Sequence, residues 1–165
     1  TTLLSFCSPG ATPGFATPGC LRVQGTQPML DGKPSRYVGA NYWYGGLLAT
    51  QGEAGKKRLR KELDFLKKHG TTNLRVMIGA EGLNHGYKYR VQQPLQTEPG
   101  KFDESIAEGL DYLMAEMGKR HMKAVLHFTN TWEGSGGLSQ YREWNKYPTP
   151  PLPKDPGFRR PTPRQ

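Results

Sequence analysis

Four side chains in this 165-residue chain have the types and positions suited to holding a sugar. Trp43 and Trp132 offer flat apolar rings, while Arg75 and Asn130 offer hydrogen-bonding groups. A pyranose ring has an apolar face of C–H groups and a belt of hydroxyls, so an indole can stack on the face while amide and guanidinium groups bind the hydroxyls. The four residues therefore predict a saccharide-binding groove, and none of them is predicted to be catalytic.

Segments that alternate between strand and helix must position these side chains. Short apolar runs predict strands at 37–41, 73–78 and 123–128, and apolar residues repeating every three or four positions predict helices at 56–69 and 103–117. This alternation is typical of parallel pairing, because a parallel connection must cross over the sheet. We therefore assign the chain to the α/β class, with the sugar-binding residues near the carboxyl ends of the strands, where ligands of such folds bind.

Each of these residues also has a purely structural interpretation. Trp43 could pack against the segment that precedes it, and Trp132, which lies in a glycine-rich loop, could belong to a core. Arg75 stands between two apolar residues, so we expect its side chain to point into the interior, where it could serve only as an ion-pair partner. His127 lies inside a strand and is expected to be an interior histidine rather than a catalyst.

The regular pattern spans residues 21–147 and is flanked by two tails of different composition. Residues 21–30 and the turn Asp31–Gly32 predict a small hairpin at the start of the domain, and the 37–41 strand is expected to be buried. Residues 1–20 carry no charge, and residues 148–165 are rich in proline, so we expect both tails to lack regular structure. Cys7 and Cys20 lie in the first tail, where an oxidising compartment would permit a disulfide.

The formal net charge of +9 at first suggests an acidic partner. The densest basic run, residues 56–68, is interleaved with leucines and contains Glu62 and Asp64, which favours a solvated helix face over a nucleic-acid site. No apolar run approaches the roughly 20 residues needed to span a bilayer. The two cysteines have no nearby histidine pair, so no zinc site is expected. We predict no nucleic-acid partner, no membrane partner, no metal and no cofactor, and we leave the oligomeric state open.

Three strands do not decide whether the sheet closes into a barrel or stays open. A doubly wound open sheet remains an alternative on the pattern alone, although the first strand-to-helix turn lacks the G-x-G-x-x-G phosphate loop of the dinucleotide-binding version. At 165 residues the chain is also shorter than the roughly 250 residues of a complete (β/α)8 barrel.

Four segments of the sequence together resemble the first half of a known enzyme family. They are Val38–Gly45, Glu62–Gly70, Asn73–Val76 and Trp132–Gly137. In this order they are similar to glycoside hydrolase family 5, with most likeness to its endo-β-1,4-mannanases. The resemblance implies a partial (β/α)8 TIM barrel of about three βα units that follows an N-terminal β-hairpin. It also implies a secreted, extracellular enzyme whose polysaccharide substrate is β-mannan or glucomannan.

The resemblance also implies a retaining mechanism with two glutamates. In that family the acid/base glutamate follows an asparagine at the end of the fourth strand, and the nucleophile ends the seventh. No Asn-Glu pair occurs in this sequence, so we expect both catalytic glutamates to be missing from the chain. Arg75 matches the arginine that supports the nucleophile, and Asn130 and Trp132 match contacts on the glycone side of the substrate.

Three other functions stay open at this stage. The chain could be part of a cellulase-like β-glucanase of the same family, or a carbohydrate-binding domain without chemistry. A third interpretation lets Glu81 and Glu133, which follow neighbouring strands, act as an acid and a base. Because three βα units leave sheet edges unpaired, we also expect the isolated chain to be marginally stable and to aggregate.

Overall fold

The computed structural model describes residues 21–83 and 90–148. Clustering of contacts divides the chain into two compact units, one ending at Val38 and the other beginning at Gly39. The predicted tails, except Pro148, and both cysteines lie outside the described residues.

The first unit is the predicted hairpin with one further short strand. Strands β1 (Leu21–Gln24), β2 (Gln27–Leu30) and β3 (Lys33–Pro34) pair antiparallel in that order. Asp31 and Gly32, at φ 49° and 76°, form the turn between β2 and β3. The predicted turn at Asp31–Gly32 is therefore confirmed, with the positive backbone angles typical of such turns.

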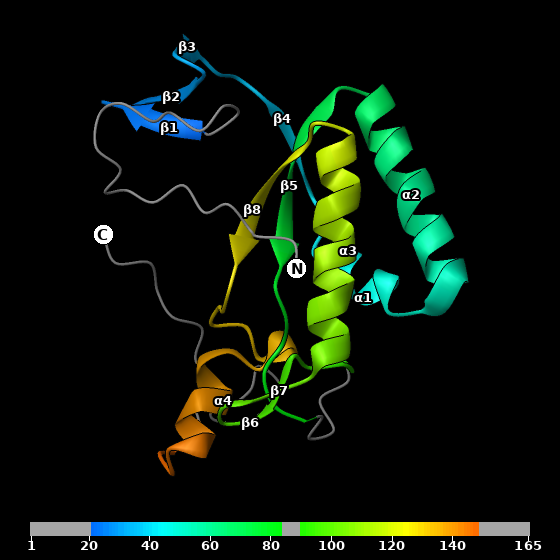
Figure 1. Ribbon diagram of the computed structural model, residues 1–165. Coiled ribbons are helices and arrows are strands. Elements are labelled where there is room, and N and C mark those ends of the chain that lie inside the picture. Colours follow the sequence, from blue (N-terminus) through cyan, green and yellow to red (C-terminus); the bar gives the residue numbers. More distant parts are fainter. Residues whose placement is uncertain (1–20, 84–89, 149–165) are drawn as a thin grey trace. The chain divides into compact units, whose positions relative to one another are not determined.

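The second unit is built on a three-stranded sheet in the order β4-β5-β8. These strands are β4 (Val38–Asn41), β5 (Thr71–Met77) and β8 (Lys123–His127). Strands β5 and β8 are parallel, with Leu74 opposite Ala124, and Figure 1 shows β4 running in the same direction. The α/β assignment is thus confirmed, and three parallel strands carry the predicted site.

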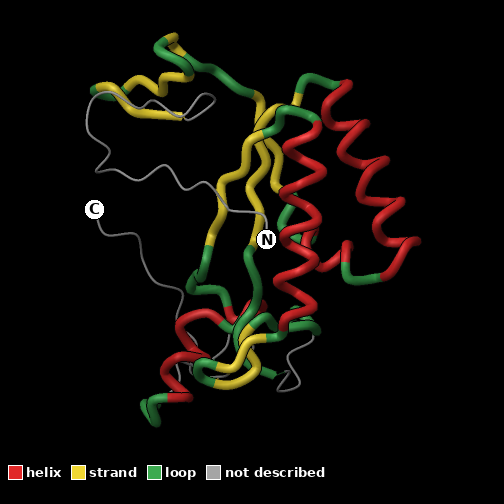
Figure 2. The backbone as a smooth tube through the Cα atoms, viewed as in Figure 1, coloured by secondary structure: helices red, strands yellow, loops and turns green. Residues whose placement is uncertain are grey.

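Three helices pack on one side of this sheet, as the tube view in Figure 2 shows for the two long ones. They are α1 (Gly45–Ala49), α2 (Gly52–Lys68) and α3 (Glu104–Lys119). Further along the chain follow the short pair β6 (Gln96–Glu98) and β7 (Lys101–Phe102), the 3₁₀ turn η1 (Glu133–Ser135) and α4 (Gly137–Trp144).

The two long helices form for the reasons that their sequences indicate. In α2, Leu59 and Leu63 are fully buried at a spacing of four, and Gly70, at φ 81°, follows the helix end in the left-handed region. The side chain of Asp103 caps α3 by accepting a hydrogen bond from the backbone nitrogen of Ser105 at 3.0 Å. Both predicted helices are confirmed, although α2 begins four residues earlier than expected.

The core lies between the sheet and the helices. Leu74 and Val76 of β5 are fully buried with Leu113 and Met117 of α3, and alternation along the strand therefore directs Arg75 to the opposite face. Arg75 is exposed there. The 37–41 strand is also more exposed than predicted, because β4 lies at the edge of the sheet and only Ala40 packs partly against the core.

The sequence does not predict the short helix α1. Its glycines explain why the pattern misses it and also how the helix packs. The segment begins with Gly45 and Gly46, which are poor helix formers. Gly45 permits close packing against α3, since a Cβ there would lie 2.8 Å from Leu113 Cδ2. On the side of α3, a Cβ on Gly109 would lie 2.5 Å from the carbonyl oxygen of Gly46. Packing against α3 therefore outweighs the weak helix propensity of the segment.

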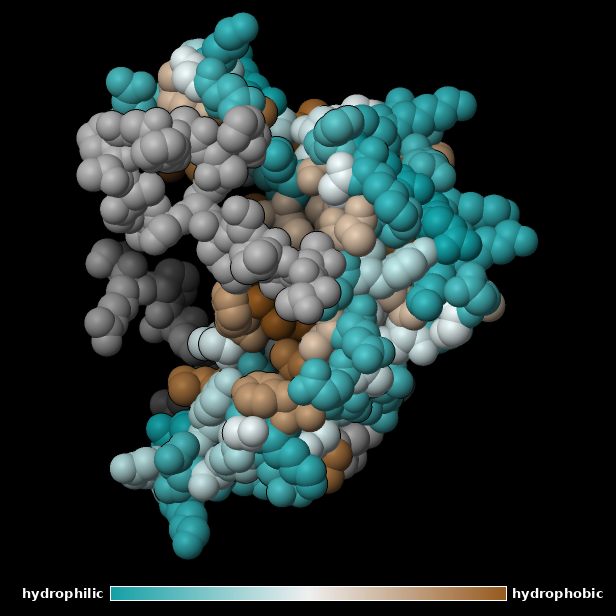
Figure 3. Space-filling view, viewed as in Figure 1, coloured by the Kyte–Doolittle hydropathy of each residue, from teal (hydrophilic) through white to brown (hydrophobic). Residues whose placement is uncertain are grey.

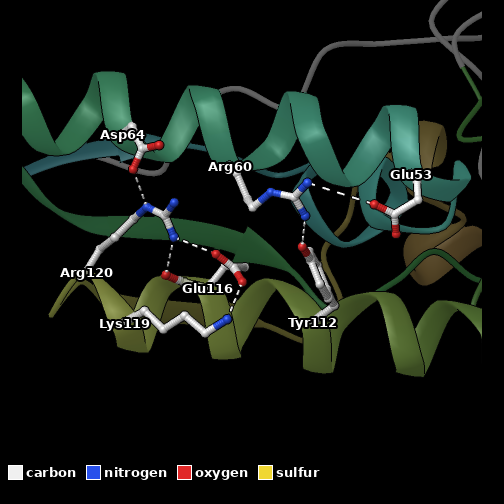
Figure 4. A network of polar contacts seen from close by, with 7 residues as sticks. All are labelled: Glu53, Arg60, Asp64, Tyr112, Glu116, Lys119 and Arg120. Carbon is white, nitrogen blue, oxygen red and sulfur yellow. Dashed lines mark hydrogen bonds and ion pairs between the residues drawn. The ribbon is translucent and has the colours of Figure 1, made fainter.

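Polar side chains also link the two long helices (Figure 4). Arg120, just after α3, donates to Asp64 of α2 at 2.7 Å and to Glu116 of α3 at 2.7 Å. Lys119 donates to the same buried Glu116 at 2.6 Å. Hydrogen bonds from Lys119 and Arg120 together lower the pKa of Glu116 and keep its buried carboxylate charged.

Candidate functional site

Three of the predicted sugar-binding residues lie in loops that follow the parallel strands, and the fourth lies within a strand. Trp43 follows β4, Arg75 lies within β5, and Asn130 and Trp132 follow β8. The side chains of Trp43 and Trp132 are 38% and 47% exposed, which is unusual for rings of this size in a folded domain. In the space-filling view, apolar side chains gather where β5 and β8 end, whereas the surface of α2 is hydrophilic (Figure 3).

Two tyrosines on either side of Trp43 fix its orientation. The hydroxyls of Tyr42 and Tyr44 both donate to Glu62 of α2, at 2.7 and 3.1 Å. Burial pushes the pKa of Glu62 up, but hydrogen bonds from Tyr42, Arg58 and Tyr44 outweigh it, so the pKa falls below its usual range. With both neighbours anchored to α2, Trp43 stands outward, its ring edge-on to Tyr44 at a centroid distance of 5.6 Å.

Asn130 is built into the loop that presents Trp132. Its Oδ1 accepts hydrogen bonds from the backbone nitrogen of Trp132 at 2.6 Å and from the hydroxyl of Ser135 at 3.0 Å. An asparagine that accepts from the nitrogen two residues ahead closes an Asx turn. The structure thus gives Asn130 a positioning role toward Trp132, besides the sugar contact that the sequence predicts.

Arg75 projects from the face of the sheet that the helices leave open. Its Nη1 donates to Asn41 Oδ1 at 3.4 Å, so the contact joins β5 to the end of β4. The prediction of an interior side chain is wrong for the described chain, because the Arg75 side chain is exposed although Asn73 and Met77, two residues to either side, are buried. An exposed guanidinium beside an amide is available to bind hydroxyls or a carboxylate.

His127 ends β8 directly opposite Met77. Burial lowers the pKa of His127, and the positive charge of Arg75 lowers it further, so the ring is neutral at neutral pH. Its Nδ1 is buried without a hydrogen-bond partner among the described residues. The expected interior character of His127 is confirmed in part, since the ring is only half-buried.

A clamp of three residues holds the loop after β8. We define the Trp132 loop as Trp132–Gly137 and the clamp as Glu81, Arg90 and Val91, all from the long connection between β5 and α3. Figure 1 shows this connection beside η1 and α4. The backbone nitrogens of Glu81 and Val91 donate to carbonyl oxygens of the Trp132 loop, at 2.9 and 2.7 Å.

The side chains of the clamp complete the attachment. Arg90 donates to the carbonyl oxygen of Glu133 at 3.0 Å and to that of Glu81 at 2.6 Å. The Glu81 carboxylate accepts from the backbone nitrogen of Gly137 at 3.2 Å. Sequence reasoning missed the clamp, since Arg90 lies in a loop without periodicity and its partner Glu133 is 43 residues away.

Glu81 is buried, with only 4% of the residue exposed. Burial raises its pKa, and hydrogen bonds from Gly137 and from the side chain of Thr129 compensate only in part. The acid and base interpretation needs this carboxylate to face a substrate beside Glu133. The carboxylate is instead enclosed by the loops that it joins, which argues against a role in bond cleavage.

Three further observations concern metal ligands, membrane spans and the charge of α2. Within 21–83 and 90–148 no group of three or more His, Cys, Asp or Glu side chains could hold a metal ion. In the same ranges no helix is long and apolar enough to cross a membrane. Along α2, Lys56 and Arg60 both approach Glu53, at 3.8 and 3.9 Å, so part of the basic face is neutralised by its own acids.

Comparison with known proteins shows the family to which the chain belongs. The sequence profile described as GH family 5 beta-mannosidase-like matches residues 19–155. The chain belongs to glycoside hydrolase family 5. The predicted resemblance is thereby confirmed at the level of the family.

Curated proteins that are similar to this family 5 chain include plant enzymes named mannan endo-1,4-beta-mannosidase. It is 28% identical over 148 residues to a mannan endo-1,4-beta-mannosidase of Arabidopsis thaliana, covering 89% of this chain and 32% of the relative. It is 32% identical over 127 residues to a mannan endo-1,4-beta-mannosidase of Oryza sativa subsp. japonica, covering 76% of this chain and 27% of the relative. The chain thus spans about a third of the length of the curated relatives that it matches.

A solved structure shows the same relation in three dimensions. The crystal structure of a glycoside hydrolase family 5 mannosidase from Rhizomucor miehei superposes with a TM-score of 0.74 at 33% sequence identity. The superposition covers 84% of this chain and 34% of that one. The α/β unit described here therefore corresponds to a part of a family 5 enzyme.

Proposed function

We propose that this chain contributes one wall of the sugar-binding cleft of a glycoside hydrolase that cleaves β-1,4-mannosidic bonds of plant mannans. The observation that carries the proposal is that exposed Trp43 and Trp132 leave parallel strands of one sheet, with the exposed Arg75 on the strand between them. Stacking rings and a guanidinium on one rim match the two surfaces of a pyranose. The names of the curated relatives supply the mannan substrate.

No residue of the chain is assigned to bond cleavage in this proposal. A retaining glycosidase needs two carboxylates about 5 Å apart, one as acid/base and one as nucleophile. Glu81 is enclosed in the clamp, and the sequence contains no Asn-Glu pair. The chain by itself is therefore proposed to bind mannan without hydrolysing it, and the whole enzyme is proposed to be secreted.

A second candidate is an exo-acting β-mannosidase. The matching family description reads beta-mannosidase-like, and the superposed Rhizomucor miehei structure is named a mannosidase rather than an endo-mannanase. The two candidates differ in how many sugars the cleft accepts. An endo-acting cleft binds a long chain across several subsites, whereas an exo-acting site gains little affinity beyond the terminal sugars.

The direct test is a titration of the 165-residue chain with mannobiose, mannohexaose and cellohexaose, followed by tryptophan fluorescence. We expect a change of emission with mannohexaose at millimolar concentration, a weaker response to cellohexaose, and no release of reducing sugar. Equal responses to mannobiose and mannohexaose would favour the exo-acting candidate. A preference for cellohexaose would favour a cellulase-like β-glucanase.

Two variants test whether the change in fluorescence arises from the proposed sugar-binding residues. Trp132→Ala should strongly reduce the fluorescence response, because it removes the emission of Trp132 and also a stacking surface worth about 1 kcal/mol or more. Trp144→Phe is the matched control, because Trp144 lies in α4 and contacts Tyr141 edge-on. No response of the unaltered chain to any of the sugars would refute the proposed function.

A further inference from the structure

We infer that the clamp formed by Glu81, Arg90 and Val91 is a positioning device that holds the Trp132 indole in place for the sugar. Glu81 and Arg90 are positioning residues in this inference, since they act through the Trp132 loop and touch no substrate. The inference rests on the proposed function for the identity of the ligand, but the clamp itself can be tested without sugar.

The first observation is the density of the attachment. Consecutive carbonyl oxygens of the Trp132 loop, those of Glu133, Gly134 and Ser135, each accept a hydrogen bond from a clamp residue. The backbone nitrogen of Gly137 then donates to the Glu81 carboxylate. A loop whose successive peptide groups are all bound by another segment has little freedom to move independently of that segment.

The second observation is that the glycines of the loop permit the close approach. A Cβ on Gly136, which has φ 92°, would collide with the carbonyl oxygen of Glu81. The ring of Trp132 in turn lies directly against Gly134, where a Cβ would collide with the indole. Clamp, loop backbone and indole therefore form one packed stack, in which a shift of the clamp displaces the ring.

The third observation is the burial of a charge that stability alone does not require. Burying a carboxylate costs free energy unless hydrogen bonds compensate, and the raised pKa of Glu81 shows that they do so only in part. An apolar residue at position 81 would avoid this cost but could not accept from Gly137. We attribute the retained carboxylate to the need to fix the loop geometry rather than to stability.

The experiment compares hydrogen exchange of the Trp132 loop in the full chain and three variants. In Glu81→Ala the amide of Gly137 loses its acceptor and should exchange at least about tenfold faster, which corresponds to a loss of about 1.4 kcal/mol of local protection. Glu81→Gln keeps an acceptor oxygen and should restore most of the protection. Glu98→Ala removes an exposed carboxylate from β6 and should leave the loop unchanged.

A further variant, Arg90→Met, tests the clamp independently if Glu81→Ala does not fold. Arg90→Met cuts the clamp at the carbonyl oxygens of Glu133 and Glu81, and it should loosen the same loop. Unchanged exchange at Gly137 in whichever of these variants folds would overturn the clamp, whether or not sugar binds.

The affinity for mannohexaose distinguishes a positioning role from a merely structural one, because a structural role alone would leave this affinity unchanged. Glu81→Ala should bind mannohexaose at least about tenfold more weakly than the unaltered chain, and Glu81→Gln should recover most of the affinity. Faster exchange with unchanged affinity would show that the clamp does not position Trp132 for the sugar. If the unaltered chain binds no sugar, the proposed function and the positioning role fail together, while the exchange data still decide whether the clamp exists.

Discussion

The Oδ1 of Asn130 lies 2.6 Å from the backbone nitrogen of Trp132, so the asparagine sets the start of the loop that presents the indole. The same oxygen accepts from the hydroxyl of Ser135 at 3.0 Å and thereby joins the two ends of the η1 turn. A residue that the sequence suggests as a sugar ligand thus also acts on the sugar through its neighbour.

Replacing Asn130 should therefore weaken sugar binding through the position of Trp132. Asn130→Ala removes both hydrogen bonds, each worth about 0.5–1.5 kcal/mol, so we expect roughly tenfold weaker binding of mannohexaose. Asn130→Asp keeps an acceptor for both donors and should retain more of the affinity. Isothermal titration provides the measurement, and an affinity of Asn130→Ala equal to that of the unaltered chain would contradict the role.

Two glycines of α3 should respond in opposite ways to the same substitution. Gly109→Ala places a methyl group 2.5 Å from the carbonyl oxygen of Gly46 and should destabilise the chain by about 1–3 kcal/mol through overpacking. Gly118→Ala meets nothing within 4 Å and should stabilise the helix by about 0.5–1 kcal/mol. Urea unfolding of both variants checks this, and equal effects would show that α1 and α3 are not closely packed.

The sequence predicts those parts of the fold that depend on local signals. Helix α3 starts at Asp103 because its carboxylate caps the helix, and Gly70 follows α2 because it adopts a left-handed conformation. Both are readable from residue type and spacing. Helix α1 is not, since its double glycine opposes helix formation and only close contact with the distant α3 explains it.

The same distinction applies to the site. The positions of Trp43 and Trp132 are predictable because each lies in the segment that follows an apolar strand. The anchoring of Tyr42 and Tyr44 on Glu62 and the contacts of Arg90 with Glu81 and Glu133 join residues 9 to 43 positions apart, and no short pattern encodes such contacts. The apolar neighbours of Arg75 predict an interior side chain, whereas the structure exposes it, because such neighbours indicate a strand and not what covers the side chain between them.

The raised pKa of Glu81 predicts a characteristic dependence of stability on pH. A carboxyl whose pKa is higher in the folded than in the unfolded chain favours folding in acid. That contribution is complete below the unfolded pKa of about 4 and is lost as the pH rises through the folded value. The free energy of unfolding of the unaltered chain, minus that of Glu81→Gln, should therefore fall as the pH rises from about 4 towards neutrality.

Urea unfolding at a series of pH values measures this difference, from which the other titrating groups cancel. Glu98→Gln, in which an exposed surface carboxylate is changed, serves as the control for the loss of one charge. A difference that rises with pH instead would mean that Glu81 is stabilised as a carboxylate, contrary to the burial that dominates its surroundings.

The link between the long helices should contribute more than an ordinary surface ion pair. Arg120→Met leaves the buried carboxylate of Glu116 with Lys119 alone and also frees Asp64, so we expect a loss of about 1–3 kcal/mol. Lys101→Met breaks only the exposed pair with Glu98 and should cost less than about 1 kcal/mol. Equal losses in thermal or urea unfolding would show that Arg120 does not join α2 to α3.

The exposed apolar side chains of the open sheet face should make the isolated chain aggregate. Val125 of β8 is 48% exposed and Phe128, just after it, is 65% exposed, on a sheet whose edge strands are β4 and β8. Apolar strands with free edges are sites of association between chains.

Val125→Thr keeps a β-branched residue suited to a strand while removing apolar surface, so it should raise the concentration at which light scattering first increases. Val76→Thr makes the same change at a fully buried position of β5 and should instead destabilise the chain by about 1–3 kcal/mol. If Val125→Thr and the unaltered chain began to scatter at the same concentration, association would have to arise from another surface.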